Sequence, residues 1–596
     1  MLSKRGLLII LKDNMNPETK ICQNCKKDFT IEPDDFSFYE KIRVPAPTWC
    51  PECRSIRRMV HRNERNLYRR TCDVTGKKII SIYRDDCPYT ICDKDYYFSN
   101  DFDPFKYGVT YNSNAKFFEQ FYEFAKKVPL ASLFVRNSEN CEYNQDMGGA
   151  SNCYLCSRTH NSKNMLYTYR GNHSSDCTDC FQAIENSEFL YESVNVSACS
   201  NSQFIHFCEK CSDSSFLYNC VGCVDCFMCT DMRNKQCYYK NEQYSRTDYK
   251  KIIDSYQLST QEGQQKALKE FEDLLKKFPR RNLTITRSNN VTGDMIFDSK
   301  DSHDVFSVKG LQNCAYIWDS SRFSDSMDTY SGMSTELTYE ATATTGHSSN
   351  CHFCVRVYDG SRDCEYSWFL QNCSNCFGCV GLKDTEYCIF NIKYSKEDYD
   401  NLLSKIKSKM REDKEYGEFF PLYISPFPYN DTVAHEYFPQ NEQYAKERGM
   451  KWGNFEEKNY KVTMPANSLP NDIKDVPDSI TGEVISCEHN GDCEHGCTKA
   501  FKIIPDELSF YRRRNLPLPK QCPNCRHYRR LAYRNSTQLR DVKCMCEGNN
   551  LSNGIYQNTV THEHGDSSCG KNIKTTIDKD SDYVIYCEEC YKKEVY

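Results

Sequence analysis

The sequence predicts a mainly β protein. Two tandem short-period β-solenoid repeats with capping helices are expected, flanked at both ends by treble-clef or zinc-ribbon-like domains. Three observations support this fold class. Both ends of the chain carry the same cysteine-rich motif, the middle is itself duplicated, and cysteine or apolar residues recur about every twelve residues within each middle copy. Short apolar segments at a fixed spacing are typical of stacked β-strands.

The composition sets broad limits on the protein. The chain has 596 residues, too many for a single hydrophobic core, and 38 of them are cysteine. Many of these cysteines form C-x2-C pairs, a spacing that is typical of metal chelation rather than of disulfides. We find no convincing export signal and no apolar run of membrane-spanning length. A cytoplasmic protein without a membrane partner is therefore expected.

The N-terminal motif has the ligand spacing of a zinc site. It reads C-x3-F-x9-Y-x10-C-P-x-C-R-x2-R-R from Cys25 and recurs without a gap 472 residues later, from Cys497. Tetrahedral zinc needs four soft ligands, and each C-x2-C turn, called a knuckle, supplies two sulfurs to one side of the ion. The expected ligands are Cys22, Cys25, Cys50 and Cys53. We expect a short hairpin of Phe29–Ile31 and Phe36–Tyr39 between the two knuckles and a helix after the second.

In the C-terminal copy the first knuckle is altered. Residue 494, where the motif needs a cysteine, is glutamate, so the partner of Cys497 is either Cys493 or Cys487. His489 and His495 lie in the same stretch and could substitute. We favour Cys493. The expected ligands are Cys493, Cys497, Cys522 and Cys525, with Cys487 as the alternative.

A second site follows the motif at the C-terminus. Its expected ligands are Cys544, Cys569, Cys587 and Cys590. A loop is inserted between the first two of these residues, and Cys546, His562 and His564 in this loop are spare candidates. About three structural Zn²⁺ sites are therefore expected in the whole chain.

The equivalent N-terminal subsite has lost sulfurs. Thr75 and Asp95 stand where two of the cysteines are expected, which leaves three candidate ligands. These are Cys72, Cys87 and Cys92. We expect this subsite to fold without metal or to bind it weakly.

The terminal motif, with the segments Asn372–Gly381, Tyr416–Phe420 and Tyr586–Tyr591, resembles the zinc-ribbon domain family of large, uncharacterised cysteine-rich proteins from candidate-phylum bacteria. The resemblance implies zinc binding and no known activity. The reduced N-terminal subsite and the widened C-terminal knuckle depart from the pattern of that family.

The middle of the chain is duplicated at an offset of about 150 residues. Each copy begins with an amphipathic helix, expected over Phe117–Lys127 and Ala267–Phe278, and ends in an N-x-x-Y-S segment that leads into another helix. The expected order is a tail (1–14), an N-terminal zinc domain (15–110), a helix with the first solenoid repeat (111–258), a helix with the second repeat (259–412), an extended linker (413–480) and C-terminal zinc domains (481–596).

Within each copy, inward-facing positions recur. In the first copy they are Cys153, Met165, Cys177 and Phe189, and the spacing resumes at Phe204 and Phe216. In the second copy they are Cys351, Cys364, Cys376 and Cys388. We expect these cysteines to pack as small hydrophobic residues between successive turns of the solenoid, here called rungs.

Two alternatives remain open for the central cysteines, namely further zinc between rungs and an iron–sulfur cluster. The strongest candidate is the C-x2-C-x2-C-x2-C run of Cys220, Cys223, Cys226 and Cys229. Its last gap is one residue shorter than the ferredoxin spacing.

Arginines follow the second knuckle at helical spacing in both motif copies. They are Arg54, Arg57, Arg58 and Arg62, with Arg526, Arg529, Arg530 and Arg534 in the C-terminal copy. Arginine on a metal-anchored helix suits phosphate contact, so nucleic acid or a ribonucleoprotein is the leading expected partner. The alternative is a solvated or internally paired face.

No motif points to catalysis. We find no phosphate-cradling loop, nucleophile elbow or H-E-x-x-H motif, and His303, His347 and His352 are isolated residues, expected in turns or at the surface. We therefore expect a non-enzymatic multi-zinc binding protein. The alternatives are a protein-interaction scaffold that uses the solenoid surface and a carbohydrate-acting enzyme with a solenoid groove.

Overall fold

The computed structural model describes residues 16–454, 460–494 and 496–596, so the expected tail lies outside the described residues. The chain forms two compact units, and each is built from two separate stretches of sequence. Unit N combines the residues up to Ser132 with Thr284–Gly453, and unit C combines Leu133–Leu283 with the residues from Asn454. Each terminal module therefore shares a unit with the repeat that is farther from it in sequence.

Unit C contains what we call the early stack, residues 135–243. Its strands follow one another in sequence order within a five-stranded and a six-stranded sheet, and neighbours are parallel except for the last pair. Paired residues are twelve apart in most rungs, as in Gln145 with Ser157. The strands are β7 (Val135–Arg136), β8 (Gln145–Gly148), β9 (Ser157–His160), β10 (Tyr169–Asn172), β11 (Phe181–Glu185), β12 (Glu188–Tyr191), β13 (Ser200–His206), β14 (Ser215–Tyr218), β15 (Val224–Thr230), β16 (Gln236–Tyr239) and β17 (Glu242–Gln243).

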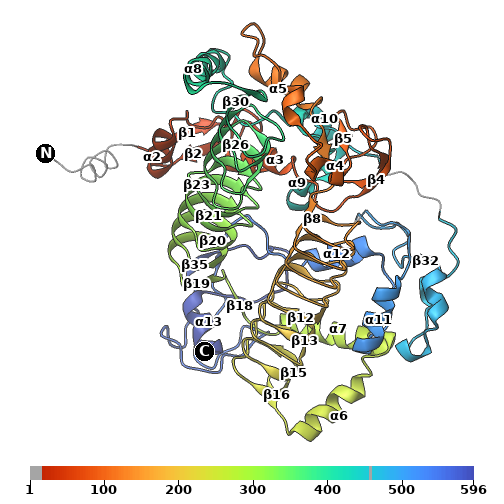
Figure 1. Cartoon of the computed structure of the whole chain (residues 1–596). Coiled ribbons are helices and arrows are strands. Elements are labelled where there is room, and N and C mark those ends of the chain that lie inside the picture. Colours follow the sequence, from red (N-terminus) through yellow and green to blue (C-terminus); the bar gives the residue numbers. More distant parts are fainter. Residues whose placement is uncertain (1–15, 455–459, 495) are drawn as a thin grey trace. The chain divides into compact units, whose positions relative to one another are not determined.

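Unit N contains the late stack, residues 285–393, which is a 13-stranded sheet. Its rungs are drawn in green in Figure 1, where β20, β21, β23 and β26 follow one another. The strands are β19 (Ile285–Thr286), β20 (Asn289–Phe297), β21 (Lys300–Lys309), β22 (Gln312–Trp318), β23 (Ser321–Tyr330), β24 (Met333–Glu336), β25 (Tyr339–Thr342), β26 (Ser349–Tyr358), β27 (Arg362–Glu365), β28 (Trp368–Gln371), β29 (Ser374–Phe377), β30 (Glu386–Ile389) and β31 (Ile392–Lys393). The chain is thus mainly β, as predicted.

The strand register confirms the predicted cysteine column of the late stack. Cys351 pairs with Cys364, Cys364 with Cys376, and Cys376 with Cys388. All four side chains are fully buried. A small side chain at this position fits the spacing of about 4.8 Å between neighbouring strands.

In the early stack three predicted inward positions, Phe189, Phe204 and Phe216, are wrong. Bridges join Lys163 to Ser175 at an interval of twelve residues, but Ser175 to Glu188 at thirteen. The extra residue places Leu190, rather than Phe189, in line with Cys177. Leu190 is fully buried and pairs with the fully buried Ser202, which continues the inward column. Phe189, Phe204 and Phe216 instead take left-handed backbone conformations at corners (φ 52°, 52° and 58°).

The corners of each rung explain why asparagine and aspartate precede the inward positions. Asn140, Asn152, Asn164 and Asp176 all have φ between 51° and 54°, a region that Asn and Asp tolerate better than other side chains. Their side chains also bond from rung to rung, with Nδ2–Oδ1 distances of 2.8, 3.2 and 3.3 Å. This ladder fixes the vertical alignment of the rungs.

In the sequence, one helix precedes and another follows each stack. The predicted first helix is α5 (Phe117–Ala125), and its counterpart α7 (Gln261–Lys276) begins six residues earlier than predicted. The N-x-x-Y-S segments lead into α6 (Arg246–Tyr256) and α8 (Lys396–Glu412). Ser245 and Ser395 are their N-caps, each accepting a backbone hydrogen bond of 3.1 Å.

The two terminal modules share one local fold. In the N-terminal module a hairpin of β1 (Glu18–Ile21) and β2 (Asp28–Ile31) precedes α2 (Pro33–Ile42) and α3 (Pro51–Met59). In the C-terminal module β32 (Ile485–Ser486), β33 (Ala500–Phe501), α11 (Pro505–Arg514) and α12 (Pro523–Leu531) follow in the same order. The predicted hairpin between the knuckles is wrong in its second half, because Phe36–Tyr39 lies in α2. Pro33 at the first helical position and a Glu32–Asp35 capping box favour the helix there.

The segment predicted as an extended linker is packed into unit N over its first half. Phe420 is fully buried, and its ring centroid lies 4.7 Å from that of Phe121 and 5.4 Å from that of Trp368. Two short helices follow, α9 (Val433–Tyr437) and α10 (Glu442–Glu447). Aromatic burial, which a solvated linker lacks, makes this stretch part of the core.

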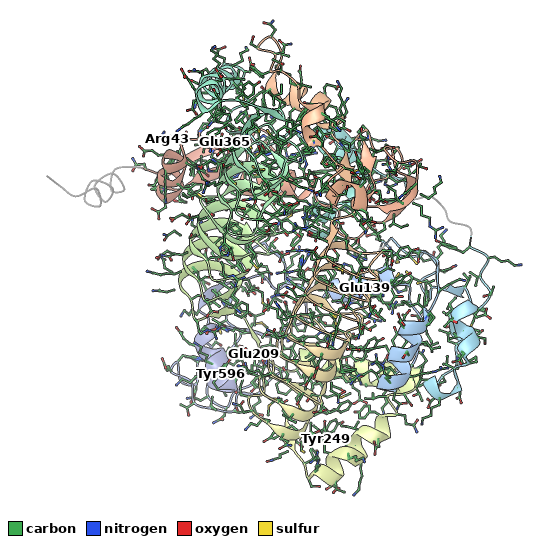
Figure 2. All side chains as sticks on the ribbon, viewed as in Figure 1. Arg43, Glu139, Glu209, Tyr249, Glu365 and Tyr596 are labelled. Carbon is green, nitrogen blue, oxygen red and sulfur yellow. The ribbon has the colours of Figure 1, made fainter. Side chains whose placement is uncertain are left out.

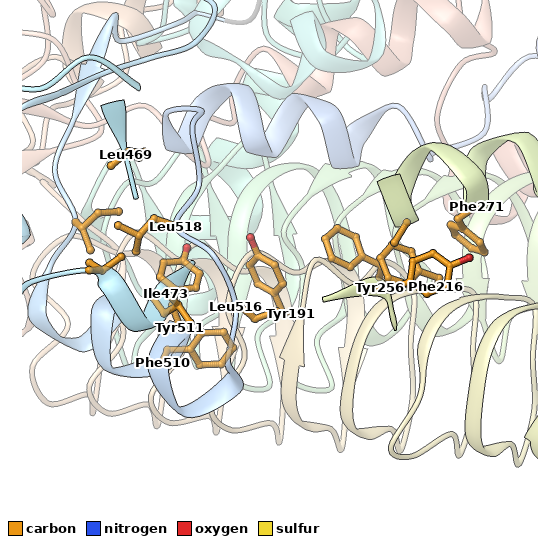
Figure 3. Close-up of a cluster of buried hydrophobic side chains, with 14 of the residues drawn as sticks. Tyr191, Phe216, Tyr256, Phe271, Leu469, Ile473, Phe510, Tyr511, Leu516 and Leu518 are labelled. Carbon is orange, nitrogen blue, oxygen red and sulfur yellow. The ribbon is translucent and has the colours of Figure 1, made fainter. Parts of the chain in front are cut away.

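The core of unit C joins the early stack to the C-terminal module (Figure 3). Tyr191 of β12 lies beside Phe510 and Tyr511 of α11, with ring centroids 6.2 and 5.8 Å apart. Phe216 of β14 packs against Phe271 of α7 at 5.7 Å. One hydrophobic cluster therefore spans segments that are more than 300 residues apart in sequence.

Candidate metal centres

The N-terminal motif gathers its four predicted cysteines. The sulfurs of Cys22, Cys25, Cys50 and Cys53 lie within 4.8 Å of one another. The distance between the Cys25 and Cys50 sulfurs is 3.8 Å, the same as the edge of about 3.8 Å that four sulfurs make around tetrahedral zinc at about 2.3 Å. The β1–β2 turn supplies one pair and the start of α3 the other, and Cys50 is the N-cap of α3. This group could hold a metal ion and is compatible with zinc.

The C-terminal copy gathers Cys487, Cys497, Cys522 and Cys525 in the same way. The preference for Cys493 is therefore wrong, because Cys487 takes the fourth place in this group. The backbone N–H of Cys522 donates to the Cys487 sulfur at 3.3 Å, as that of Cys50 donates to the Cys22 sulfur at 3.2 Å. The first knuckle has thus kept its geometry and gained seven residues between its two cysteines.

Cys493 remains close to this centre. Its sulfur lies 3.7 Å from that of Cys525, and the two form a smaller group with His489. His495, the other histidine considered, lies outside the described residues.

The second C-terminal site is assembled from the predicted residues Cys544, Cys569, Cys587 and Cys590. A hairpin of β34 (Arg540–Lys543) and β35 (Asn572–Thr575) carries the first two, and the last two begin α13 (Glu588–Val595) after β36 (Ile585–Tyr586). The sulfurs of Cys569 and Cys587 are 4.0 Å apart. The Cys587 N–H donates to the Cys544 sulfur at 3.1 Å.

The N-terminal counterpart of this site keeps the backbone geometry but not the ligands. The hairpin of β3 (Tyr68–Thr71) and β4 (Lys78–Ser81) precedes α4 (Lys94–Phe98), and the Asp93 N–H donates to the Cys72 sulfur at 3.2 Å. Asp93 therefore stands where Cys587 stands in the other copy, so the predicted placement of Asp95 is wrong and Tyr96 stands where Cys590 does. The thiols of Cys87 and Cys92 instead donate to the carbonyls of Pro426 and Leu130, each at 3.5 Å. In the part of the chain that the structure describes, these three cysteines do not form a metal-binding group.

The central cysteines also do not gather around a common point. Cys220, Cys223, Cys226 and Cys229 are buried, and each thiol donates to the carbonyl two residues earlier, at 3.4 to 3.6 Å. Among the described residues no three of them have sulfurs that all lie within 4.8 Å of one another. This geometry favours cysteine as a packing residue over both a zinc site and an iron–sulfur cluster. None of the 38 cysteines forms a disulfide.

The arginines of α3 are buried against the late stack. Arg54 and Arg58 are both 1% exposed and pair with Asp328 on β23 at 2.9 and 3.1 Å. Arg57 and Arg58 pair with Glu340 on β25 at 2.8 and 2.9 Å. Although burial lowers the pKa of the Arg54 guanidinium, the Asp328 carboxylate holds that pKa above its ordinary value.

The same cluster is built a second time in unit C. Arg526 pairs with Asp179 at 2.5 Å, and Arg530 pairs with Asp179 at 2.9 Å and with Glu192 at 3.0 Å. Arg529 reaches Glu192 at 2.6 Å while 38% of its side chain stays exposed. These three arginines correspond to the three of α3 by the repeat of 472 residues.

Ring contacts repeat as well. The Arg54 guanidinium lies 5.2 Å from the ring centroid of Tyr316, and that of Arg526 lies 4.5 Å from Tyr167. The hydroxyl of Tyr316 donates to Asp35 at 3.0 Å. The hydroxyl of Tyr167 donates to Glu507, which occupies the position of Asp35 in the C-terminal copy, at 2.8 Å.

The expectation of an arginine face open to phosphate is therefore wrong for most of these side chains. Arg62 is also buried, paired with Glu64 at 2.5 Å, and Arg534 is partly exposed. The prediction that Arg62 continues the helix of the other arginines is also wrong, because α3 ends at Met59. The carboxylates of the two clusters, Asp179, Glu192, Asp328 and Glu340, were not predicted, although both pairs recur at an offset of about 150 residues.

Two of the histidines expected at the surface make defined contacts. His352 is 4% exposed, and its Nε2 lies 3.1 Å from the Leu337 carbonyl oxygen. His303 on β21 lies 3.3 Å from Asp35 of α2 and 3.3 Å from Asp304. Burial alone would lower the pKa of His303, but hydrogen bonds to Asp304 and Asp35 raise it to about 10.

Comparisons with known proteins assign the chain to no family. No family model matches it, and no curated protein matches it. One solved structure, described as that of an acetyltransferase from Desulfovibrio desulfuricans G20, is 8% identical over 45% of this chain and 68% of its own. Its TM-score is 0.11, so this likeness carries no argument. In the described part of the chain, no helix has the length and apolarity of a membrane span.

Replacing Glu340 tests the ion cluster. We expect Glu340→Gln to lower the free energy of unfolding of unit N by about 3–5 kcal/mol, because it leaves buried arginines without their counter-charge. All four tryptophans (Trp49, Trp318, Trp368 and Trp452) belong to unit N, so urea unfolding followed by tryptophan fluorescence reports this unit. Glu386→Gln, at an exposed site on β30, is the control. Equal effects of the two variants would contradict the assigned role of the cluster.

Replacing His303 tests whether the stability of the fold depends on pH through this side chain. A pKa raised to about 10 means that protonated His303 stabilises the fold fully below its ordinary pKa of about 6.5, and that this contribution is lost as pH rises towards 10. The melting temperature of the protein should therefore exceed that of His303→Asn at pH 6, and the difference should shrink between pH 7 and 10. His347→Asn, at an exposed turn, is the control. A pH-independent difference for His303→Asn would contradict the ion pairing.

Proposed function

We propose that the protein is a non-enzymatic multi-zinc scaffold. In this proposal each stack is a β-solenoid, and the three four-cysteine groups are structural zinc sites of zinc-ribbon-like modules. The observation that carries the proposal is the duplicated ion cluster, in which arginines next to the knuckle cysteines bind carboxylates of the stack in the same unit. The metal-anchored helices thus hold each unit together.

Zinc is supported by the donor set and its surroundings. Four thiolates in a group with edges of 3.6 to 4.0 Å suit a tetrahedral ion. Backbone N–H groups that donate to Cys22, Cys487 and Cys544 stabilise the thiolate form that binds metal. A site with four protein sulfurs has no open position for substrate, which favours a structural role.

The stack surfaces support a protein partner. A solenoid presents an extended surface of regularly repeated side chains, about 4.8 Å apart from rung to rung. On the early stack the exposed corner ladder of Asn140 and Asn152 runs along such a surface. Figure 2 labels Glu139 and Glu209 on the same stack, and both side chains are exposed. Acidic and amide groups of this kind suit a polar or basic protein surface.

Replacing Arg57 and Arg58 together distinguishes a scaffold from a protein that binds nucleic acid. We expect Arg57→Ala with Arg58→Ala to lower the melting temperature, because buried Glu340 loses both of its close arginine partners and Asp328 loses one of two. The affinity for a labelled single-stranded RNA or DNA should stay unchanged. Filter binding at two salt concentrations measures the affinity. Arg43→Ala, at an exposed site in the same module, is the control. A salt-dependent loss of affinity at unchanged melting temperature would support nucleic acid instead.

Partner capture tests the scaffold itself. Tagged full-length protein should retain specific protein partners after extensive nuclease treatment of the lysate. Glu139→Arg with Glu209→Arg should reduce that capture, because it replaces exposed acidic groups by cations on the proposed surface. Loss of all partners after nuclease treatment would contradict the proposal.

A further inference from the structure

A loop in the C-terminal module folds back on its metal-binding helix. The N-terminal copy lacks this stretch, which lies between Cys546 and Cys569 and has almost no regular secondary structure among its described residues. Even so, it brings Cys546, His562 and His564 together with Cys590 of α13, with all ligand atoms within 4.8 Å of one another. We propose that these residues form a second zinc site that shares the Cys590 thiolate with the neighbouring four-cysteine site.

The distances fit a tetrahedral ion. With zinc–sulfur bonds of about 2.3 Å and zinc–nitrogen bonds of about 2.05 Å, a sulfur and a nitrogen on one ion are about 3.5 Å apart. The Nε2 atom of His564 lies 3.5 Å from the Cys546 sulfur and 3.4 Å from the Cys590 sulfur. The Nδ1 atom of His562 lies 3.7 Å from the Cys546 sulfur. The two imidazoles and two thiolates therefore already stand at coordination distances.

Supporting groups orient both imidazoles. The Nε2 atom of His562 lies 2.8 Å from a Glu594 carboxylate oxygen, and both side chains are almost fully buried. This contact leaves Nδ1 to face the sulfurs, as in the carboxylate–histidine–metal arrangements of known zinc sites. The Nδ1 atom of His564 lies 2.7 Å from the Ser567 carbonyl oxygen, which leaves its Nε2 for the ion.

The loop is fixed around Cys546 by a buried amide. Asn558 is 2% exposed, and its Nδ2 donates to the Cys546 sulfur at 3.2 Å and to the Gly548 carbonyl at 2.7 Å. The hydroxyl of Tyr586 donates to the Asn558 side-chain oxygen at 2.6 Å. A charged sulfur ligand that accepts such a bond is stabilised as thiolate.

Cys590 links the two sites because its sulfur belongs to both groups. A thiolate has more than one lone pair and can bridge two zinc ions. The inference goes beyond the proposed function, which requires only the three four-cysteine sites. The second ion would fasten the inserted loop to α13, in a stretch that has little secondary structure of its own to order it.

Metal counting tests this site. We expect four zinc ions per chain in the full-length protein after anaerobic purification, measured by native mass spectrometry and elemental analysis. Cys546→Ser with His564→Gln should retain three, because the four-cysteine sites are untouched. Cys354→Ser, which alters a fully buried thiol of the late stack, should retain four. Three zinc ions both in the unaltered protein and in the Cys546/His564 variant would overturn the inference.

Zinc K-edge absorption provides a readout that does not depend on stoichiometry. The unaltered protein should show a minor imidazole contribution in a mainly sulfur environment, and the Cys546/His564 variant should lose it. A purely sulfur environment in the unaltered protein would overturn the inference. Loss of one ion from Cys25→Ser with Cys53→Ser tests the proposed function separately, because those residues belong to the other unit.

Discussion

The structure of each unit depends on a buried pairing of arginines with carboxylates. Asp328 and Glu340 lie opposite each other on neighbouring strands because the rung spacing is twelve residues. Two buried carboxylates at about 4.8 Å repel each other and lose hydration, so the stack alone would be destabilised there. The three arginines of α3 supply the opposite charge. The carboxylates in turn give these buried arginines their counter-ions. Stack and module therefore stabilise each other.

The metal-binding groups explain how the arginines reach that position. In both modules a knuckle cysteine is the N-cap of the arginine helix, so the cysteine group fixes where the helix begins, and the arginines follow within its next two turns. The ion cluster then joins this helix to the stack. Because module and stack were duplicated with their contacting residues, the same arrangement of Arg, Asp, Glu and Tyr recurs in unit N and unit C.

Local features were predictable from sequence, whereas pairings over long distances were not. The four-cysteine set of the N-terminal module, the column from Cys351 to Cys388 and the serine-capped helices depend on nearby residues, and they were predicted correctly. Arg54 looks like a surface residue because its counter-ion Asp328 is 274 residues away. Cys487 was passed over because seven extra residues move it out of register, although the backbone contacts around it are unchanged.

The N-terminal module packs on the late stack, which is far from it in sequence. Zero-length carbodiimide cross-linking of the full chain tests this directly, because the Lys41 ammonium of α2 lies 3.3 Å from the Asp325 carboxylate of β23 and both groups are substantially exposed. Mass spectrometry should identify a Lys41–Asp325 cross-link. Cross-links from Lys41 to the early stack, with none to the late stack, would contradict the account.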